Sequence, residues 1–171
     1  MPSFTHFSDH NLLDVIDCLH NELIKSSFTV SIAESCTGGF LSSCLTSLSG
    51  SSSYFKGSMV VYSNEIKIEF LDIHEKHINE YGVASQPVVE LMAKNIQKKF
   101  NTTFGLATTG YVDGVSSLLS GDKKEIQNYV WIAISTDKSV YSKRLVLDGD
   151  RLNNISVVSL AILELLRKEI L

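Results

Sequence analysis

Apolar residues recur along the chain at two spacings, and the alternation of the two predicts an α/β protein. A helical spacing of three or four residues runs through 12–24, 38–48, 64–71, 86–100 and from about 150 to the C-terminus. Short and largely apolar runs, typical of buried strands, lie at 28–33, 58–63, 104–110, 129–135 and 139–148. Helices between such strands indicate a sheet that is covered on both faces, and a hairpin at 136–138 makes that sheet mixed.

One segment, residues 111–128, breaks this pattern. It contains glycines and charges and has no sustained period. Connections of this length are uncommon in compact domains unless they cover a site or lack order. We therefore expect 111–128 to form a mobile lid. Elsewhere the helix starts are marked more clearly. We expect Ser8 or Asp9 to cap the first helix, and Ser85 to cap the helix at 86–100, with Pro87 in its first turn.

Length and composition fit one globular domain. The chain has 171 residues, of which 44% are hydrophobic, which allows one sizeable core and not several, so we expect a single domain over 1–171. A formal net charge of -4 argues against nucleic acid or an anionic membrane as the partner, since both are bound by clustered Lys and Arg. A local anion pocket is compatible with that charge.

Cysteine usage and the N-terminus predict a cytoplasmic protein. Cys18, Cys36 and Cys44 have no paired spacing, so they indicate neither a disulfide framework nor a zinc site. The first residues lack the basic flank and apolar stretch of a signal peptide, and no apolar run reaches the roughly 20 residues that span a bilayer.

Candidate chemistry gathers where the predicted strands end, which is where open α/β sheets bind ligands. Ser35 follows the first strand and precedes a glycine-bearing helix start, whose free N–H groups favour an anion or oxyanion. A serine nucleophile needs a nearby base; otherwise Ser35 or Thr37 simply caps the helix. Cys36 is the rival nucleophile, but no nearby His would activate it, and a small packed side chain is its expected role.

Lys67 is the candidate base. Behind a cap at Ser63 or Asn64 it falls in the first turn of its helix, where the dipole disfavours an ammonium and lowers the pKa. Such a lysine serves as the general base of a Ser-Lys hydrolase. The alternative is a solvated lysine on a short surface helix. Tyr62, at the end of the preceding strand, would pack through its ring or offer its hydroxyl to the same site.

Two further strand ends carry candidates. Arg151 lies at the start of the last helix, where a cation is unfavourable, so it either clamps a phosphate or carboxylate or pairs with Asp148 or Asp150. Thr109 and Gly110 end a strand and either allow close approach of a ligand or form an ordinary turn.

A metal site is not expected from the histidines. His74 and His77 do not have the spacing of a zinc helix, and surface positions explain them better. The glycine-rich loops of the common nucleotide-binding folds do not occur in the sequence either.

Seven short motifs together resemble the CinA C-terminal domain family, the nicotinamide mononucleotide deamidases. In chain order they are AESCTGG (33–39), GSS (50–52), YSNEIK (62–67), YGVAS (81–85), TTG (108–110), VWIAI (130–134) and GDR (149–151). The resemblance implies a three-layer α/β/α sandwich around a mixed, mostly parallel sheet. It also implies hydrolysis of the carboxamide of nicotinamide mononucleotide to nicotinate mononucleotide and ammonia, with no metal and no cofactor.

Carried over motif by motif, the resemblance assigns roles to ten residues. Ser35 would be the nucleophile, Lys67 its base, and Tyr62 a further catalytic residue. Arg151 would meet the phosphate. The other substrate-binding residues it implies are Thr37, Gly38, Gly39, Ser52, Thr109 and Gly110. The implied partner is a small pyridine mononucleotide, in a protein that we expect to form a homo-oligomer.

The sequence departs from the family after Gly110. Family members continue with IAGP and a glycine-rich loop, whereas this chain reads YVDGVSSLLSGDKKEIQN. Backbone positions that need positive φ suit glycine and suit Tyr111 or Val112 poorly, so the loop must differ in shape. Two hypotheses follow: a deamidase, or a related module that has changed its substrate or lost the reaction and binds nucleotides or proteins.

Overall fold

The computed structural model describes residues 10–113 and 128–171. Its strands and helices alternate along the chain as the apolar spacing predicts. The elements are α1 (His10–Ser26), β1 (Val30–Glu34), α2 (Phe40–Thr46), the 3₁₀ helix η1 (Ser51–Ser53), β2 (Phe55–Val60), α3 (Asn64–Leu71), α4 (Glu75–Tyr81), α5 (Gln86–Phe100), β3 (Phe104–Tyr111), β4 (Tyr129–Ser135), β5 (Val140–Val146) and α7 (Arg151–Ile170).

The described strands form one mixed sheet in the order β2-β1-β3-β4-β5. β1 pairs in parallel with β2 and with β3, whereas β4 is antiparallel to both β3 and β5. β4 is thus the strand that runs against the others. The predicted hairpin joins β4 to β5, and the N–H of Thr136 donates to the carbonyl of Ser139 at 2.9 Å in its turn.

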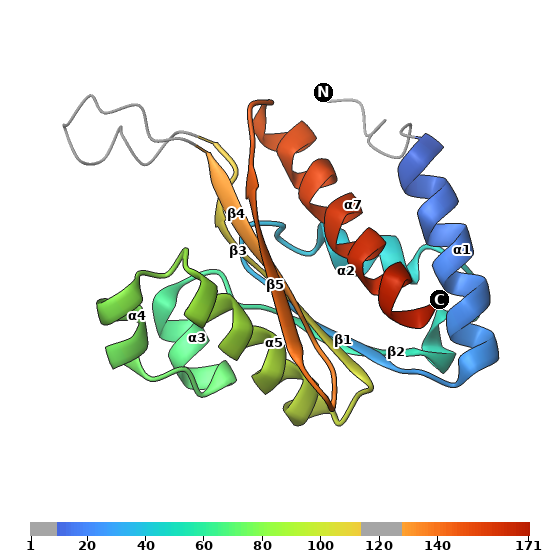
Figure 1. Ribbon diagram of the computed structural model, residues 1–171, viewed down its shortest axis with the longest axis horizontal. Coiled ribbons are helices and arrows are strands. Elements are labelled where there is room, and N and C mark those ends of the chain that lie inside the picture. Colours follow the sequence, from blue (N-terminus) through green and yellow to red (C-terminus); the bar gives the residue numbers. More distant parts are fainter. Residues whose placement is uncertain (1–9, 114–127) are drawn as a thin grey trace.

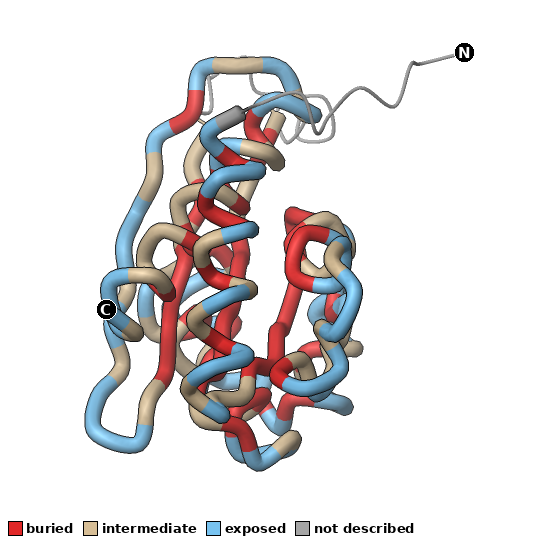
Figure 2. The backbone as a smooth tube through the Cα atoms, turned by 90° about the vertical axis from the view of Figure 1, so that its right-hand side faces the viewer, coloured by how far each residue is buried: buried red, intermediate tan, exposed pale blue. Residues whose placement is uncertain are grey.

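Helices cover both faces of the sheet, which confirms the three-layer α/β/α fold. Figure 1 shows the sheet edge-on, with α1, α2 and α7 on one side and α3, α4 and α5 on the other. Each side has its own buried apolar cluster, the first built around residues such as Leu19, Ile32 and Ile162 and the second around Val89, Met92 and Ala107. In Figure 2 the central strands appear as buried tubes between partly exposed helices.

Two local differences from the sequence prediction have a physical cause. β2 begins at Phe55, earlier than the apolar run suggests, because at the sheet edge Lys56 is exposed and Gly57 allows the close approach of Phe100, so neither residue continues the apolar pattern. α4 was not predicted, and Ile78 is its one buried residue, so it has no apolar period to detect.

The parallel arrangement brings three strand ends to the same edge of the sheet. Glu34, at the end of β1, is level with Val60 of β2 and Thr108 of β3. The residues that follow these positions include Ser35, Tyr62 and Thr109, so the fold gathers the candidate side chains at one place. None of the helices in the described ranges is both long and apolar enough to cross a membrane.

Candidate active site

Ser35 sits in the tight turn between β1 and α2. Its N–H donates to the carbonyl of Thr108 at 3.1 Å, and its own carbonyl accepts from the N–H of Gly38 at 3.2 Å. Gly38 and Gly39 have φ values of 60° and 99°, a left-handed geometry that glycine adopts without strain. The turn therefore fixes the Ser35 backbone against β3, and its side chain lines a cavity.

Lys67 reaches Ser35 from α3. Its Nζ lies 3.2 Å from Ser35 Oγ and 3.2 Å from the carbonyl oxygen of Tyr62. The residue is 1% exposed, which rules out the solvated surface lysine considered from the sequence. Ser63 caps α3, its Oγ accepting from the N–H of Ile66 at 3.3 Å.

Burial lowers the pKa of Lys67 to about 8, because the ammonium is stripped of water. The direction is the one predicted from the sequence, but the predicted cause, the start of the helix, is not the main one. Loss of hydration dominates, and the neighbouring Glu65 carboxylate acts in the opposite sense. With that pKa, about a tenth of Lys67 is a neutral amine at pH 7, far more than for an ordinary lysine, and the neutral amine is the form that a general base requires.

Glu34 is a functional residue that sequence reasoning missed. Its carboxylate is fully buried and accepts hydrogen bonds from the hydroxyl of Thr37 at 2.7 Å and from the N–H groups of Gly39, Leu41 and Ser42 at 2.9, 3.2 and 2.8 Å. The Ser42 hydroxyl also donates to it. Glu34 therefore caps α2, and its position inside the AESCTGG motif was the available signal.

This cap corrects the roles expected for Thr37, Gly38 and Gly39. The first N–H groups of α2 already bind the Glu34 carboxylate, so they are not available to an anionic ligand as the sequence had implied. Thr37 is buried, with its hydroxyl also 2.9 Å from the hydroxyl of Thr108. These three residues shape the Ser35 turn and do not line the cavity.

Ser52 is not brought to the site at all. It belongs to η1, which precedes β2, and Phe55 at the start of β2 is paired with Val30 at the start of β1. Ser52 therefore lies at the opposite end of the parallel strands from Ser35.

Cys36 adjoins the nucleophile candidate without the properties of a nucleophile. It is buried, and this burial raises the pKa of its thiol to about 12. A thiol with such a pKa stays protonated at neutral pH and attacks poorly. The structure supports the packing role expected for Cys36.

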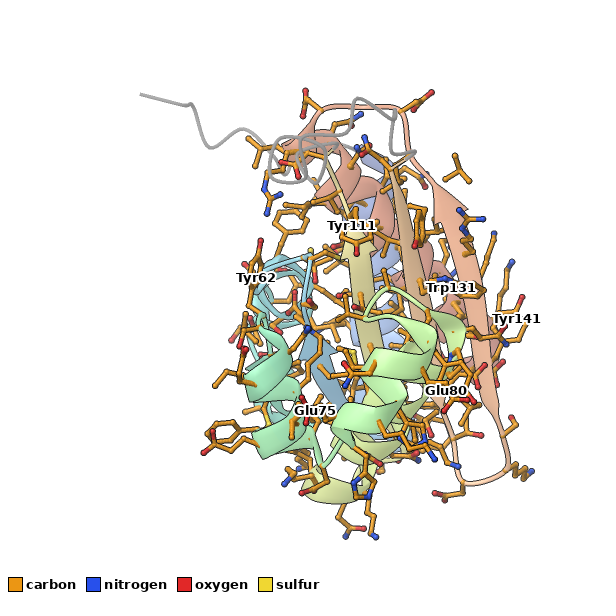
Figure 3. The ribbon with its side chains drawn as sticks, turned by 90° about the vertical axis from the view of Figure 1, so that its left-hand side faces the viewer. Tyr62, Glu75, Glu80, Tyr111, Trp131 and Tyr141 are labelled. Carbon is orange, nitrogen blue, oxygen red and sulfur yellow. The ribbon has the colours of Figure 1, made fainter. Side chains whose placement is uncertain are left out.

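A cavity of about 220 Å³ unites most of the predicted site residues. Figure 3 labels Tyr62 and Tyr111, two of its lining residues, at the same end of the sheet. Lining residues that the sequence had not suggested include Asn64, Val83 and Asp113. The full lining is Ser35, Cys36, Tyr62, Asn64, Lys67, Val83, Thr109, Gly110, Tyr111, Val112, Asp113 and Arg151.

Thr109 and Gly110 form the floor of this cavity within β3, not in a turn after it. The hydroxyl of Thr109 donates to the carbonyl of Val83 at 3.0 Å, tying the α4–α5 connection to the strand. Gly110 has φ 149°, and a Cβ there would lie 2.4 Å from the carbonyl oxygen of Tyr129. Close pairing with β4 therefore requires the glycine, whatever the ligand.

Arg151 is held by two groups of the chain itself. Its Nη1 lies 2.9 Å from Oδ2 of Asp113, and its Nη2 donates to the hydroxyl of Tyr62 at 2.9 Å. Of the two alternatives considered for Arg151, the ion pair with Asp148 or Asp150 is not formed: the guanidinium pairs with Asp113, and Asp150 caps α7 by accepting from the N–H of Asn153 at 2.9 Å.

The altered stretch after Gly110, predicted to form a lid over 111–128, is described only at its two ends, since 114–127 lie outside the described residues. Tyr111 continues β3, paired with Tyr129, and neither Tyr111 nor Val112 has positive φ. The chain therefore avoids the glycine geometry by extending the strand.

Metal-ligating side chains are not clustered in the described ranges 10–113 and 128–171. No group of three or more His, Cys, Asp or Glu side chains there could hold an ion. His74 and His77 stack near each other on α4 and its cap, away from the cavity lining.

Fold and site together define a three-layer α/β/α protein with a serine–lysine pair at the carboxyl ends of its parallel strands. The chain belongs to the CinA C-terminal domain family, whose sequence model matches residues 14–170.

Among curated relatives, a CinA-like protein of Flavobacterium psychrophilum is 41% identical over 165 residues, covering 96% of this chain and 38% of the relative. A CinA-like protein of Cytophaga hutchinsonii is 37% identical over 148 residues, covering 86% of this chain and 34% of the relative. The chain thus spans little more than a third of the length of these relatives.

Solved structures share the fold at low identity. A competence or damage-inducible protein from Enterobacter asburiae superposes with a TM-score of 0.85 at 21% identity, covering 94% of this chain and 98% of that one. The competence damage-inducible protein A from Klebsiella pneumoniae gives 0.84 at 21%, covering 92% and 96%.

Proposed function

We propose that this protein is an amidohydrolase that deamidates nicotinamide mononucleotide to nicotinate mononucleotide and ammonia. The observation that carries the proposal is the 3.2 Å contact between Ser35 Oγ and the Nζ of the buried Lys67. Membership of the CinA C-terminal domain family, with the motifs around both residues intact, supports it. Cytoplasmic location and homo-oligomer formation remain predictions.

In this mechanism the neutral amine of Lys67 accepts the proton of Ser35 as Oγ attacks the carboxamide carbon. The resulting ammonium returns the proton to the departing nitrogen, so that ammonia leaves and an ester on Ser35 remains. A water molecule then attacks the ester, Lys67 takes one of its protons, and that proton passes to the departing Ser35 oxygen; the nicotinic acid mononucleotide that is released gives its remaining proton to solvent. Protons and bonds balance over the cycle without any further reactant.

Two side chains would hold the substrate and the cavity wall during these steps. The hydroxyl of Tyr62 accepts from Arg151 and keeps its own proton, which it can donate to substrate oxygen. The hydroxyl of Thr109 already donates to the carbonyl of Val83, so its proton is not directed at an oxyanion. Its role would be to hold Val83 in the cavity lining. The carbonyl of Tyr62 keeps the Lys67 amine pointed at Ser35.

The test is ammonia release from nicotinamide mononucleotide by purified protein without added metal. Ser35→Ala should abolish it, whereas Cys36→Ala, the adjacent buried position, should keep it. Activity that survives in Ser35→Ala would overturn the proposed nucleophile.

A second candidate function is a binding module that has lost the reaction. The observation favouring it is the changed sequence after Gly110, which puts Asp113 on the arginine expected to meet substrate. Nucleotide-induced thermal stabilisation with no ammonia release, in protein shown to be folded, would support this alternative over the deamidase.

A further inference from the structure

The arginine at the outer part of the cavity is already paired with an anion of its own chain. The Arg151 and Asp113 side chains are 41% and 32% exposed, whereas Ser35 and Lys67 at the inner part are buried. One guanidinium nitrogen binds the Asp113 carboxylate and the other binds the Tyr62 hydroxyl. A carboxylate on guanidinium is the same kind of contact that a phosphate would make.

The buried Asn154 of α7 holds the backbone next to both members of this pair. Its Nδ2 donates to the carbonyls of Val112 and Gly149, both at 2.7 Å, and its Oδ1 accepts from the N–H of Gly149 at 3.1 Å. Val112 precedes Asp113 and Gly149 lies two residues before Arg151. One side chain therefore fixes the backbones that present the two members of the pair.

Asp113 changes what the cavity offers to a phosphate. Of the described residues that line it, Lys67 and Arg151 are the cations and Asp113 is the anion. Lys67 is directed at Ser35, so a phosphate has Arg151 as its partner and must either sit beside the Asp113 carboxylate or displace it. Both possibilities reduce the gain from binding a dianion.

We propose that Asp113 is a specificity-determining residue that takes the anion-binding position on Arg151, so that the site accepts pyridine nucleoside carboxamides without a phosphate. The choice of substrate in this inference rests on the proposed amidohydrolase function. The weaker binding of phosphate to Arg151 depends only on the ion pair with Asp113. The substrate class is then a carboxamide on a pyridine nucleoside, for which the phosphate contributes little to recognition.

The experiment compares kcat/KM for nicotinamide mononucleotide and nicotinamide riboside in the wild type, Asp113→Asn and Asp148→Asn. Asp148 is an exposed carboxylate outside the cavity lining, so its variant makes the same change in net charge. We expect the wild type to use the two compounds within about tenfold of each other. Asp113→Asn should raise the preference for the mononucleotide by about tenfold or more, the range of a charge-assisted hydrogen bond.

A binding measurement separates failure of this inference from failure of the proposed function. Titration calorimetry with inorganic phosphate should show about tenfold tighter binding to Asp113→Asn than to the wild type, and no gain in Asp148→Asn. The double variant Asp113→Asn/Arg151→Gln should lose that gain. Asp113→Ala provides the same test if the Asn variant does not fold.

The possible outcomes are distinct. If no protein releases ammonia from either compound, the proposed function fails, and the phosphate titration still tests Asp113. An unchanged substrate preference and unchanged phosphate affinity in Asp113→Asn would overturn the inference. Equal gains in Asp113→Asn and Asp148→Asn would also overturn it, because the effect would then be one of general charge.

Discussion

The inner and outer parts of the cavity are built in different ways. At the inner part, Ser35 and Lys67 are buried and in contact with each other, and Glu34, outside the cavity lining, is buried against the start of α2. At the outer part, Arg151 and Asp113 are partly exposed, and Asp113 lies in the stretch after Gly110 where the sequence leaves the family pattern. Under the proposed amidohydrolase function, the reaction chemistry and the recognition of substrate would be carried by separate sets of residues, which could change independently.

The largest expected effect is loss of the nucleophile. Ser35→Ala should lower kcat by about 10³-fold or more, because it removes the hydroxyl that the Lys67 amine contacts and that would form the acyl-enzyme. Ammonia release measures it, and circular dichroism checks the fold. Cys36→Ala should stay within a few-fold of wild type. A large loss in Cys36→Ala would show that the inner part depends on packing more than on Ser35 itself.

Removing the Glu34 charge tests how the inner part is held. Glu34→Gln places an amide NH₂ against N–H donors of Gly39, Leu41 and Ser42, leaving buried groups unpaired. We expect a loss of about 3 kcal/mol in the free energy of unfolding, measured by urea denaturation. Glu22→Gln, an exposed carboxylate on α1, is the control and should change stability by less than about 0.5 kcal/mol.

The pH dependence of the proposed reaction should follow the ionisation of the Lys67 amine. With its pKa lowered to about 8, the fraction of neutral amine falls tenfold for each pH unit below 8. kcat/KM should therefore rise with slope one up to about pH 8 and level off above it. A profile that is flat between pH 6 and 9 would contradict the assignment of Lys67 as base.

The buried Lys67 should also lower the stability of the folded protein, by an amount that depends on pH. Because the folded pKa of Lys67 lies below its ordinary value of 10.5, the unfolded chain binds the proton more tightly, and the group destabilises the fold below pH 8. Lys67→Met should then be inactive but more stable at pH 7, by about 2 kcal/mol or roughly 4–8 °C in Tm. This advantage should shrink as pH rises from 8 towards 10.5, which thermal scans at several pH values can follow.

The smallest expected effect is at the outer part. Tyr62→Phe removes the hydroxyl that Arg151 binds but keeps the carbonyl that holds Lys67. We expect KM for nicotinamide mononucleotide to rise about three- to tenfold with kcat nearly unchanged. A fall in kcat as large as that of Ser35→Ala would mean that Tyr62 acts in the chemical step.

The order of strands and helices could be predicted from apolar spacing, and the Ser35–Lys67 pair from motifs. Periodicity failed where burial is one-sided or slight, as at the start of β2 and in α4. The site failures have another origin. Glu34 looks like the polar end of a strand until the chain folds back and directs the N–H groups of α2 at it.

Asp113 and Ser52 illustrate what local sequence does not contain. The partner of Asp113 lies 38 positions away on α7, whereas nearby Asp148 and Asp150 looked like better partners for the same arginine. Ser52 shares a motif set with the site, yet its place before β2 puts it at the other end of the strands. In both cases the topology of the sheet, not the spacing of residues, decides the contact.

The two contacts of Tyr62 also differ in how amino-acid replacement at position 62 affects them. Lys67 is held by a main-chain carbonyl, which no amino-acid replacement at position 62 deletes, whereas Arg151 is held by a side-chain hydroxyl, which one replacement removes. A lineage can therefore explore new partners for the arginine by single substitutions while the base keeps its acceptor. If the proposed amidohydrolase function holds, such an arrangement would let the preferred ligand change while the catalytic pair stays the same.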